Sequence, residues 1–137
     1  MKKLFALLVI ALLAVGCCSS CRWRYKNAKP LEGTTWHLVK VGGESYTLPL
    51  DSFNIILNEN GLGGRGACNS LLGHYATGEK YALRFSALGS TKMLCPENEA
   101  LEMQLIKVLS QTTHYDIDFD MLMLMRNGEV LAVFKAQ

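Results

Sequence analysis

The chain has 137 residues, half of them hydrophobic, and a formal net charge of +2. From Leu31 onward it carries eight basic and twelve acidic residues, a net charge of −4, with no basic cluster of the kind that nucleic acid requires. The part from Leu31 to Gln137 has room for one small domain. Composition therefore excludes a nucleic-acid-binding protein and a second domain.

Residues 1–16 have the organisation of an export signal. Two lysines precede an uncharged apolar run over residues 4–15, which is shorter than the roughly 20 apolar residues that cross a bilayer. Such a signal is removed on export, so the fold begins after it.

The junction "LLAVGC" resembles the lipobox of bacterial lipoproteins. Small residues at Val15 and Gly16 stand directly before Cys17, although Ala14 occupies the position where leucine is usual. Cys18 is the poorer acceptor because a cysteine would then precede it. The resemblance implies cleavage before Cys17 and a diacylglyceryl thioether on it, usually with a third acyl chain, and several chains anchor a protein stably. The alternative is a soluble secreted protein with an ordinary cleavage site.

Residues 17–30 form the lipidated N-terminus and a tether. Four cations alternate here with Trp23 and Tyr25, which suits a segment near anionic headgroups, and a merely soluble linker is the alternative. Because Cys18 is not aspartate, the usual sorting rule does not indicate the inner membrane, and we expect the outer membrane.

Once Cys17 is acylated, the cysteines that remain allow three pairings in an oxidising compartment: Cys18, Cys21, Cys68 and Cys95.

Three stretches in the first half of the domain have the composition and alternation of strands: residues 34–41, 52–58 and 74–86. A Gly-Gly pair ends the first, the turn signal Asn60-Gly61 closes the second, and the third bends at Thr77-Gly78 into two short pieces. The residues expected on one face of each stretch are Trp36, Leu38 and then Lys40; Phe53, Ile55 and Leu57; and Tyr81, Leu83 and Phe85.

One segment has a helical pattern, and we expect a helix over about residues 97–110. Pro96 is placed in its first turn, and glutamates follow at the positive end of the helix dipole. The stripe expected to face a sheet comprises Leu101, Leu105, Val108 and Leu109.

The C-terminal segment predicts a strand pair around Asn127-Gly128, preceded by a third alternating strand. Both faces are apolar from Met121 to Met125, so we expect this strand to be covered on both sides. The strand has three methionines, Met121, Met123 and Met125. We expect them in the core, and an adaptable binding surface is the alternative. The predicted fold is α+β, a strand-rich antiparallel sheet, partly closed and barrel-like, with one helix packed on it.

Gly61, Gly63 and Gly66 have the spacing G-x-G-x-x-G of a dinucleotide-binding loop, but the surrounding sequence does not fit such a loop. That loop needs a helix that starts inside the motif and an acid about 20 residues further on. Here the following stretch is interrupted at Gly73 before two helical turns, and Arg84 stands near the position of the acid. We therefore expect neither a nucleotide nor any other cofactor.

Asp116, Asp118 and Asp120 imitate the start of a calcium loop. That loop demands a glycine after the third acid and a glutamate at its twelfth position, and the sequence has neither there. On a strand, alternate side chains lie about 6.6 Å apart, so three carboxylates cannot converge on one ion. We expect no metal here and interpret the row, together with His114, as a solvated strand face.

Cys68, Asn69 and His74 are the residue types of a cysteine-nucleophile site. A thiol-dependent hydrolase using Cys68 with His74 is therefore one alternative, although the compartment favours bonded cysteines, which have no thiolate. Around Cys68 and Cys95, no Cys-x-x-Cys or His-x-x-x-His spacing supports a zinc site.

Four stretches of the domain form a recognisable pattern when taken in order. They are "LEGTTWHLVKVGG" at residues 31–43, "GRGACNSLLGHY" at 64–75, "STKMLCPENEALE" at 90–102 and "LMLMRNGEVLAVFK" at 122–135. Together they resemble the META domain, also called the HslJ-like family, over essentially all of residues 31–137. One departure is Ala67, where the family usually has a glycine.

The resemblance implies a compact antiparallel sheet with one helix, often on an exported lipoprotein, with no established enzymatic activity and no agreed ligand. Members are linked in general terms to envelope stress and antibiotic tolerance. The matching positions form a structural signature: Trp36, Gly64, Cys68, Asn69, Gly73, Tyr75, Thr91, Met93, Cys95 and Pro96. A bridge between Cys68 and Cys95 would close a loop of about 27 residues and contribute roughly 3 to 4 kcal/mol in the chain-entropy model; two free thiols are the alternative.

We therefore expect a lipid-anchored, non-enzymatic envelope protein with a signal peptide at 1–16, a tether at 17–30 and a META domain at 31–137. Its expected partners are the membrane, through the lipid on Cys17, and an envelope protein or ligand, without nucleotide, nucleic acid, cofactor or metal. The alternatives are the thiol-dependent hydrolase and a small-ligand carrier with an apolar barrel interior.

Overall fold

The structure is a computed structural model that describes residues 26–94 and 96–137. The expected signal peptide, the expected lipidation residue Cys17, and Cys18, Cys21 and Cys95 lie outside the described residues. No helix in the described part of the chain is long and apolar enough to span a membrane.

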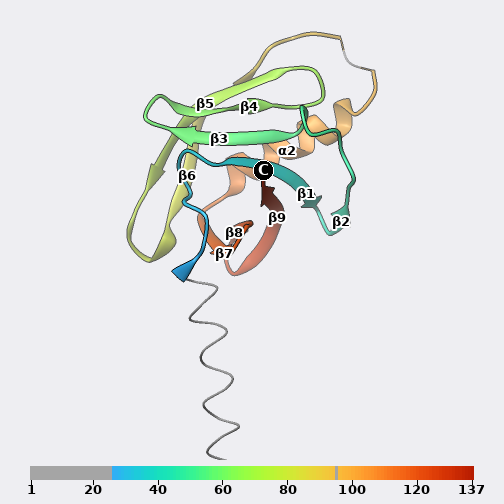
Figure 1. Ribbon diagram of the computed structural model, residues 1–137. Helices are drawn as coiled ribbons and strands as arrows, with labels where there is room; N and C mark the ends of the chain where they lie inside the picture. Colours follow the sequence, from blue (N-terminus) through green and yellow to red (C-terminus); the bar gives the residue numbers. More distant parts are fainter. Residues whose placement is uncertain (1–25, 95) are drawn as a thin grey trace, which may run out of the picture.

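Antiparallel strands make up most of the molecule (Figure 1). In chain order the elements are β1 (Thr35–Val41), β2 (Glu44–Ser45), β3 (Asn54–Asn58), β4 (Gly61–Arg65), β5 (Ser70–Thr77), the 3-10 turn η1 (Glu79–Tyr81), β6 (Leu83–Ser90), α2 (Glu99–Gln111), β7 (His114–Asp118), β8 (Met121–Arg126) and β9 (Glu129–Ala136). The strands of the sheet follow the order β6-β5-β4-β3-β1-β9-β8-β7, and β2 pairs with β1.

The two end strands, β6 and β7, approach each other, so that the sheet curls into a half-barrel. The Leu83 N–H donates to the Thr113 carbonyl at 3.0 Å, and Ala82 forms an isolated bridge with His114. Helix α2 joins these strands in the chain and contacts β6, β1 and β8. The expected α+β fold, a partly closed antiparallel sheet with a helix packed on it, is confirmed.

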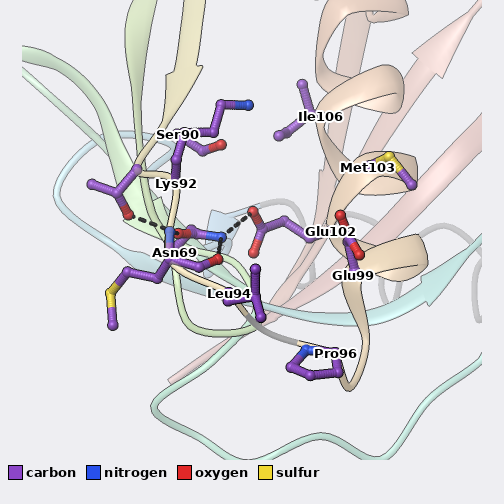
Figure 2. A pocket seen from close by; sticks show the side chains of 11 residues that line it. Asn69, Ser90, Lys92, Leu94, Pro96, Glu99, Glu102, Met103 and Ile106 are labelled. Atoms are coloured by element: carbon purple, nitrogen blue, oxygen red, sulfur yellow. Dashed lines mark hydrogen bonds between the residues drawn. The ribbon is translucent and has the colours of Figure 1, made fainter.

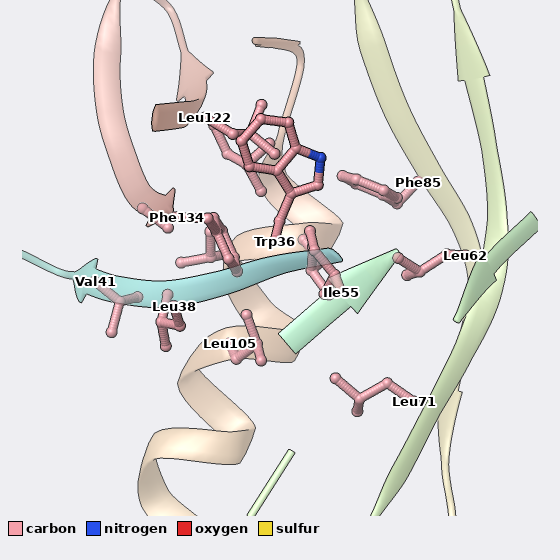
Figure 3. Packing of buried hydrophobic residues seen from close by; sticks show 14 of the residues in the cluster. Trp36, Leu38, Val41, Ile55, Leu62, Leu71, Phe85, Leu105, Leu122 and Phe134 are labelled. Atoms are coloured by element: carbon pink, nitrogen blue, oxygen red, sulfur yellow. The ribbon is translucent and has the colours of Figure 1, made fainter. Parts of the chain in front are cut away.

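The hydrophobic core is gathered around Trp36 in the space between the sheet and α2 (Figure 3). Trp36 is fully buried, and its indole N–H donates to the Leu31 carbonyl at 3.0 Å. The largest fully buried side chains are Trp36, Phe53, Phe134, Leu38, Ile55, Leu57, Leu83, Leu105, Leu109, Leu122, Leu124 and Val41. The expected helical stripe from Leu101 to Leu109 is buried as well, so helical spacing predicted the packed face correctly.

Strand β1 keeps the expected alternation only over its first half. Trp36 and Leu38 face the core, but the register against β9 shifts between Leu38 and Lys40. Lys40 is therefore exposed and Val41 is fully buried. The expectation that Lys40 shares a face with Trp36 and Leu38 is wrong, because a bulge between Leu38 and Lys40 reverses the alternation.

A glycine-rich strand, β4, lies between β3 and β5, where the sequence predicted only a glycine stretch. Glycine is disfavoured in strands, so neither propensity nor alternation indicates this element. A Cβ at Gly64 would overlap the Asn54 carbonyl oxygen and lie 3.0 Å from the Ile55 Cα. Position 64 is therefore glycine because the backbone of β3 passes too close for a side chain there.

Two further expectations about local structure are wrong. Tyr81 has a φ of +60° in η1 and is 46% exposed, so it leaves the buried row that Leu83 and Phe85 continue. Pro96 precedes the helix, because α2 begins at Glu99 after Asn98, whose φ is +67°.

Strand β8 is covered on one face only. Leu122 and Leu124 are fully buried, whereas Met121, Met123 and Met125 are partly exposed on the other face. The expected cover on both sides is wrong, because α2 reaches only the concave face of the curled sheet.

Candidate functional site

The Asn69 side chain lies at the centre of a hydrogen-bond network between the β4–β5 loop, the segment after β6 and helix α2 (Figure 2). Its Oδ1 accepts hydrogen bonds from the Thr91 hydroxyl at 2.9 Å and the Met93 N–H at 2.8 Å. Its Nδ2 donates to Glu102 Oε1 at 3.0 Å and to the Met93 carbonyl at 3.4 Å. All four hydrogen-bonding positions of the amide are thus used.

Glu102 holds the other side of this network. The residue is only 6% exposed, and its Oε2 accepts a hydrogen bond from the Ala67 N–H at 2.9 Å. A Cβ at Gly66 would lie 2.6 Å from the Glu102 Cγ and Cδ atoms, so glycine makes room for the carboxylate. A buried charge requires such partners.

Sequence reasoning missed Glu102, although a signal was present. It stands three positions before Leu105 and seven before Leu109, so it lies on the apolar face of α2. A carboxylate at such a position indicates a buried partner elsewhere in the fold.

Above this network lies a hollow of about 560 Å³, which we name the β6–α2 groove. One wall is the segment from Ser90 to Leu94 and the other is the first half of α2 (Figure 2). Three apolar side chains at the groove are largely solvent-exposed: Met93 at 62%, Leu94 at 95% and Met103 at 61%. The groove therefore has a hydrogen-bonded polar network beneath it and solvent-exposed apolar side chains along its sides.

Comparison with known proteins decides the family. The family model of the META domain matches residues 29–137. The chain belongs to the META domain family. A solved structure, described as the NMR structure of the protein from Burkholderia xenovorans, has a TM-score of 0.62 with this chain at 20% identity. The likeness covers 78% of this chain and 83% of that one, and shows a shared fold. No curated protein matches.

The signature residues of the META domain fall into separate regions. Asn69, Thr91 and Met93 form the network, and Pro96 lines the groove. The other positions lie outside the groove: Trp36 in the core, Gly64 in β4, and Gly73 and Tyr75 in β5. A Cβ at Gly73 would lie 3.0 Å from the Leu88 Cδ2 atom and 3.2 Å from the Ser86 carbonyl oxygen, so a side chain there would displace its neighbours.

Tyr75 belongs to a second hollow, of about 590 Å³, at the other end of β5. Its hydroxyl donates to Glu32 Oε1 at 2.8 Å. Desolvation, followed by the hydrogen bond to Glu32 and the negative charge of that residue, raises the pKa of Tyr75 to about 12. The phenol is therefore held in its neutral form at all moderate pH values.

Cys68 and His74 lie at opposite ends of the β4–β5 hairpin. Cys68 is disulfide-bonded in the structure, and it precedes Ser70, where β5 begins. His74 lines the hollow of Tyr75, four residues along the strand from Ser70, a separation of roughly 13 Å. The fold does not place this histidine beside the sulfur.

The acidic row on β7 is exposed at His114 and Asp116 and half-buried at Asp118. Asp116 Oδ1 accepts a hydrogen bond from the neighbouring Ile117 N–H at 2.9 Å. Across residues 26–94 and 96–137, no three His, Cys, Asp or Glu side chains are grouped so that they could hold a metal ion.

Proposed function

We propose that this protein is a lipid-anchored, non-enzymatic envelope protein whose META domain binds another envelope protein in the β6–α2 groove. The observation that carries the proposal is the exposure of Met93, Leu94 and Met103 beside a groove of fixed shape. Large exposed apolar side chains grouped in this way are typical of interaction sites.

The polar groups below the groove support binding rather than catalysis. The Asn69 amide forms hydrogen bonds with Thr91, Met93 and Glu102, and the Glu102 carboxylate accepts hydrogen bonds from two N–H groups. Groups engaged in this way hold the segment after β6 in place, which supports a structural role for them.

A protein segment is the favoured occupant. Leu94 is 95% exposed and projects from the wall of the groove, and a projecting side chain gains most by entering a pocket of a partner. Methionines such as Met93 and Met103 adapt readily to a partner surface. Lys92 and Glu99 place both charges beside the groove, which suits a polar rim.

The anchor and the disulfide are parts of the same proposal. The sequence "LLAVGC" supports lipidation of Cys17, and with it an outer-membrane location and a role in envelope stress or antibiotic tolerance.

For the disulfide we infer that Cys95 is the partner of Cys68. Two hydrogen bonds that join Met93 to Asn69 support this pairing. Met93 is two positions before Cys95 and Asn69 directly follows Cys68, so these bonds hold the two segments together near the cysteines.

In-cell photocrosslinking tests the groove. A photoreactive phenylalanine analogue at Leu94 should form one discrete adduct with an envelope protein, and Met103→Glu should abolish this adduct. The matched control places the analogue at Leu72, which is 56% exposed on β5 and does not line the groove. Identical adducts at both positions, or an adduct unaffected by Met103→Glu, would contradict the proposal.

The anchor has its own test. Palmitate labelling of the full chain should disappear in Cys17→Ser and persist in Cys18→Ser. Globomycin should cause the precursor to accumulate. A mature chain that carries no palmitate would refute the anchor and leave the groove proposal to the crosslinking result.

A further inference from the structure

We propose that the META domain rests on the membrane through an aromatic surface, made of Tyr81, Tyr115 and Phe119, which we name the aromatic base. Its partner is the boundary between lipid headgroups and acyl chains. The inference goes beyond the β6–α2 groove and rests on the proposed lipid anchor.

The aromatic base lies where the described chain begins. The Lys29 N–H donates to the Phe119 carbonyl at 2.7 Å, and a hollow of about 210 Å³ is bounded by Ala28, Tyr81 and Tyr115. Figure 1 shows the start of the described chain at the same end of the molecule as β7 and the β5–β6 turn. The described chain therefore begins on the same side of the domain as the aromatic base, and the proposed anchor precedes it in the sequence.

The rings of the aromatic base are arranged for contact with an interface. Tyr81 is 46% and Phe119 is 40% exposed. Tyr81 and Tyr115 meet edge to face with ring centroids 5.7 Å apart. Partly exposed aromatic rings are the side chains enriched at the membrane–water boundary, because one part is apolar and the other tolerates water.

Backbone strain occurs at both exposed rings. Tyr81 has a φ of +60° and Phe119 a φ of +58°, values that are unfavourable for bulky residues. Each residue lies in a short connection between strands, where glycine or asparagine would adopt this conformation more readily. Strain of this kind is often found at functional positions, and both of these strained residues have exposed rings.

Charges of both signs lie near the aromatic base. Lys29 and Lys80 are the cations, and the acids are Glu32, Glu79, Asp116, Asp118 and Asp120. Attraction to anionic headgroups would be offset by these acids, so the contact should depend on the rings and persist at high salt.

The tether limits how far the domain can move from the bilayer. Nine steps along the chain lead from Cys17 to Lys26, and at no more than about 3.6 Å per step they span at most about 32 Å. A short tether keeps the local concentration of the aromatic base at the membrane high, so that even a weak contact is populated.

Depth-dependent fluorescence quenching tests the orientation. The full-length lipidated protein, in a Trp23→Phe background, receives one new tryptophan: Phe119→Trp, Tyr81→Trp or, as control, Leu72→Trp on β5. Each variant is placed on phosphatidylethanolamine and phosphatidylglycerol vesicles with brominated acyl chains. Trp36 is fully buried and contributes the same background to all three.

Bromination should reduce the emission of Trp at positions 81 and 119 about twofold, in low and high salt, and leave position 72 nearly unchanged. Vesicle flotation reports anchoring separately. A protein that floats but is quenched equally at all three positions overturns the orientation alone. A protein that does not float overturns the lipid anchor and this inference together.

Discussion

The Asn69 amide donates a hydrogen bond to the Glu102 carboxylate at 3.0 Å and joins two segments that are 33 residues apart in the sequence. The same amide accepts hydrogen bonds from Thr91 and Met93. One side chain thus fixes the loop after β4, the segment after β6 and the first half of α2 relative to one another. This relationship explains why residues from separate signature motifs meet in space.

The first prediction concerns the buried carboxylate. Glu102→Ala removes the acceptor of the Ala67 N–H and of the Asn69 amide, which leaves two donors without their partner. Each unsatisfied buried group costs about 1 to 3 kcal/mol, so the free energy of unfolding should fall by about 2 to 4 kcal/mol. Urea denaturation followed by circular dichroism measures the change.

Glu97→Ala is the matched control for Glu102→Ala. Glu97 is exposed and precedes the helix, and substitutions at such positions usually change stability by no more than about 0.5 kcal/mol. Equal effects of the two substitutions would show that the network does not stabilise the fold.

The second prediction compares neighbouring glycines of β4. Gly64→Ala should lower the free energy of unfolding by at least about 2 kcal/mol, because its Cβ meets the rigid backbone of Asn54 and Ile55. Gly63→Ala should stay within about 1 kcal/mol, because its Cβ meets only the Ile56 Cγ2 atom at 3.5 Å. Thermal unfolding of both variants distinguishes them, and similar melting temperatures would refute the close-approach explanation.

The sequence was sufficient to predict the strand-rich antiparallel fold and its helix. Alternation located the buried row of β3, helical spacing located the buried face of α2, and Asn127-Gly128 marked the last hairpin. Each of these signals is local, because it arises from residues that belong to one element.

The errors arose where the structure depends on a distant segment. Nothing within "GLGGR" indicates a strand, because the reason for Gly64 is the backbone of β3 and the reason for Gly61 is the Gly73 carbonyl of β5. Lys40 was misplaced because the bulge is defined by pairing with β9. Glu102 was missed because its partners, Ala67 and Asn69, lie on another element.

The third prediction concerns the proposed bridge between Cys68 and Cys95. Cys68→Ser and Cys95→Ser should each lower the free energy of unfolding by roughly 3 to 4 kcal/mol, as estimated for a loop of this length. The double variant should be no less stable than either single variant, because both changes remove one bridge. Urea denaturation measures all three, with Cys21→Ser as the control.

The pairing itself is checked by peptide mapping without reductant. A linked peptide that contains Cys68 and Cys95 is the expected product. If Cys68 is found with Cys18 or Cys21 instead, the proposed pairing is wrong, and Cys95→Ser should then leave the stability unchanged.

The fourth prediction concerns the pH dependence of Tyr75. Its pKa of about 12 in the folded protein exceeds the ordinary value of 10.0, so the folded state retains the phenol proton where the unfolded state loses it. This contribution to stability is fully present below pH 10 and is lost as the pH rises towards about 12. The pKa values of Tyr46 and Tyr115 are raised as well, so the Tyr75 titration is identified by difference: absorbance at 295 nm should show a late step that is lost in Tyr75→Phe.

Glu32→Gln separates the causes of that shift. Desolvation is the largest cause and the Glu32 hydrogen bond the next, so removing the carboxylate charge should bring the pKa of Tyr75 closer to 10 without reaching it. Glu59→Gln changes a carboxylate in the same hollow that makes no hydrogen bond to Tyr75, and the late titration should remain. If both variants titrate like the parent, Glu32 does not hold the phenol proton, and the pKa would be raised by desolvation alone.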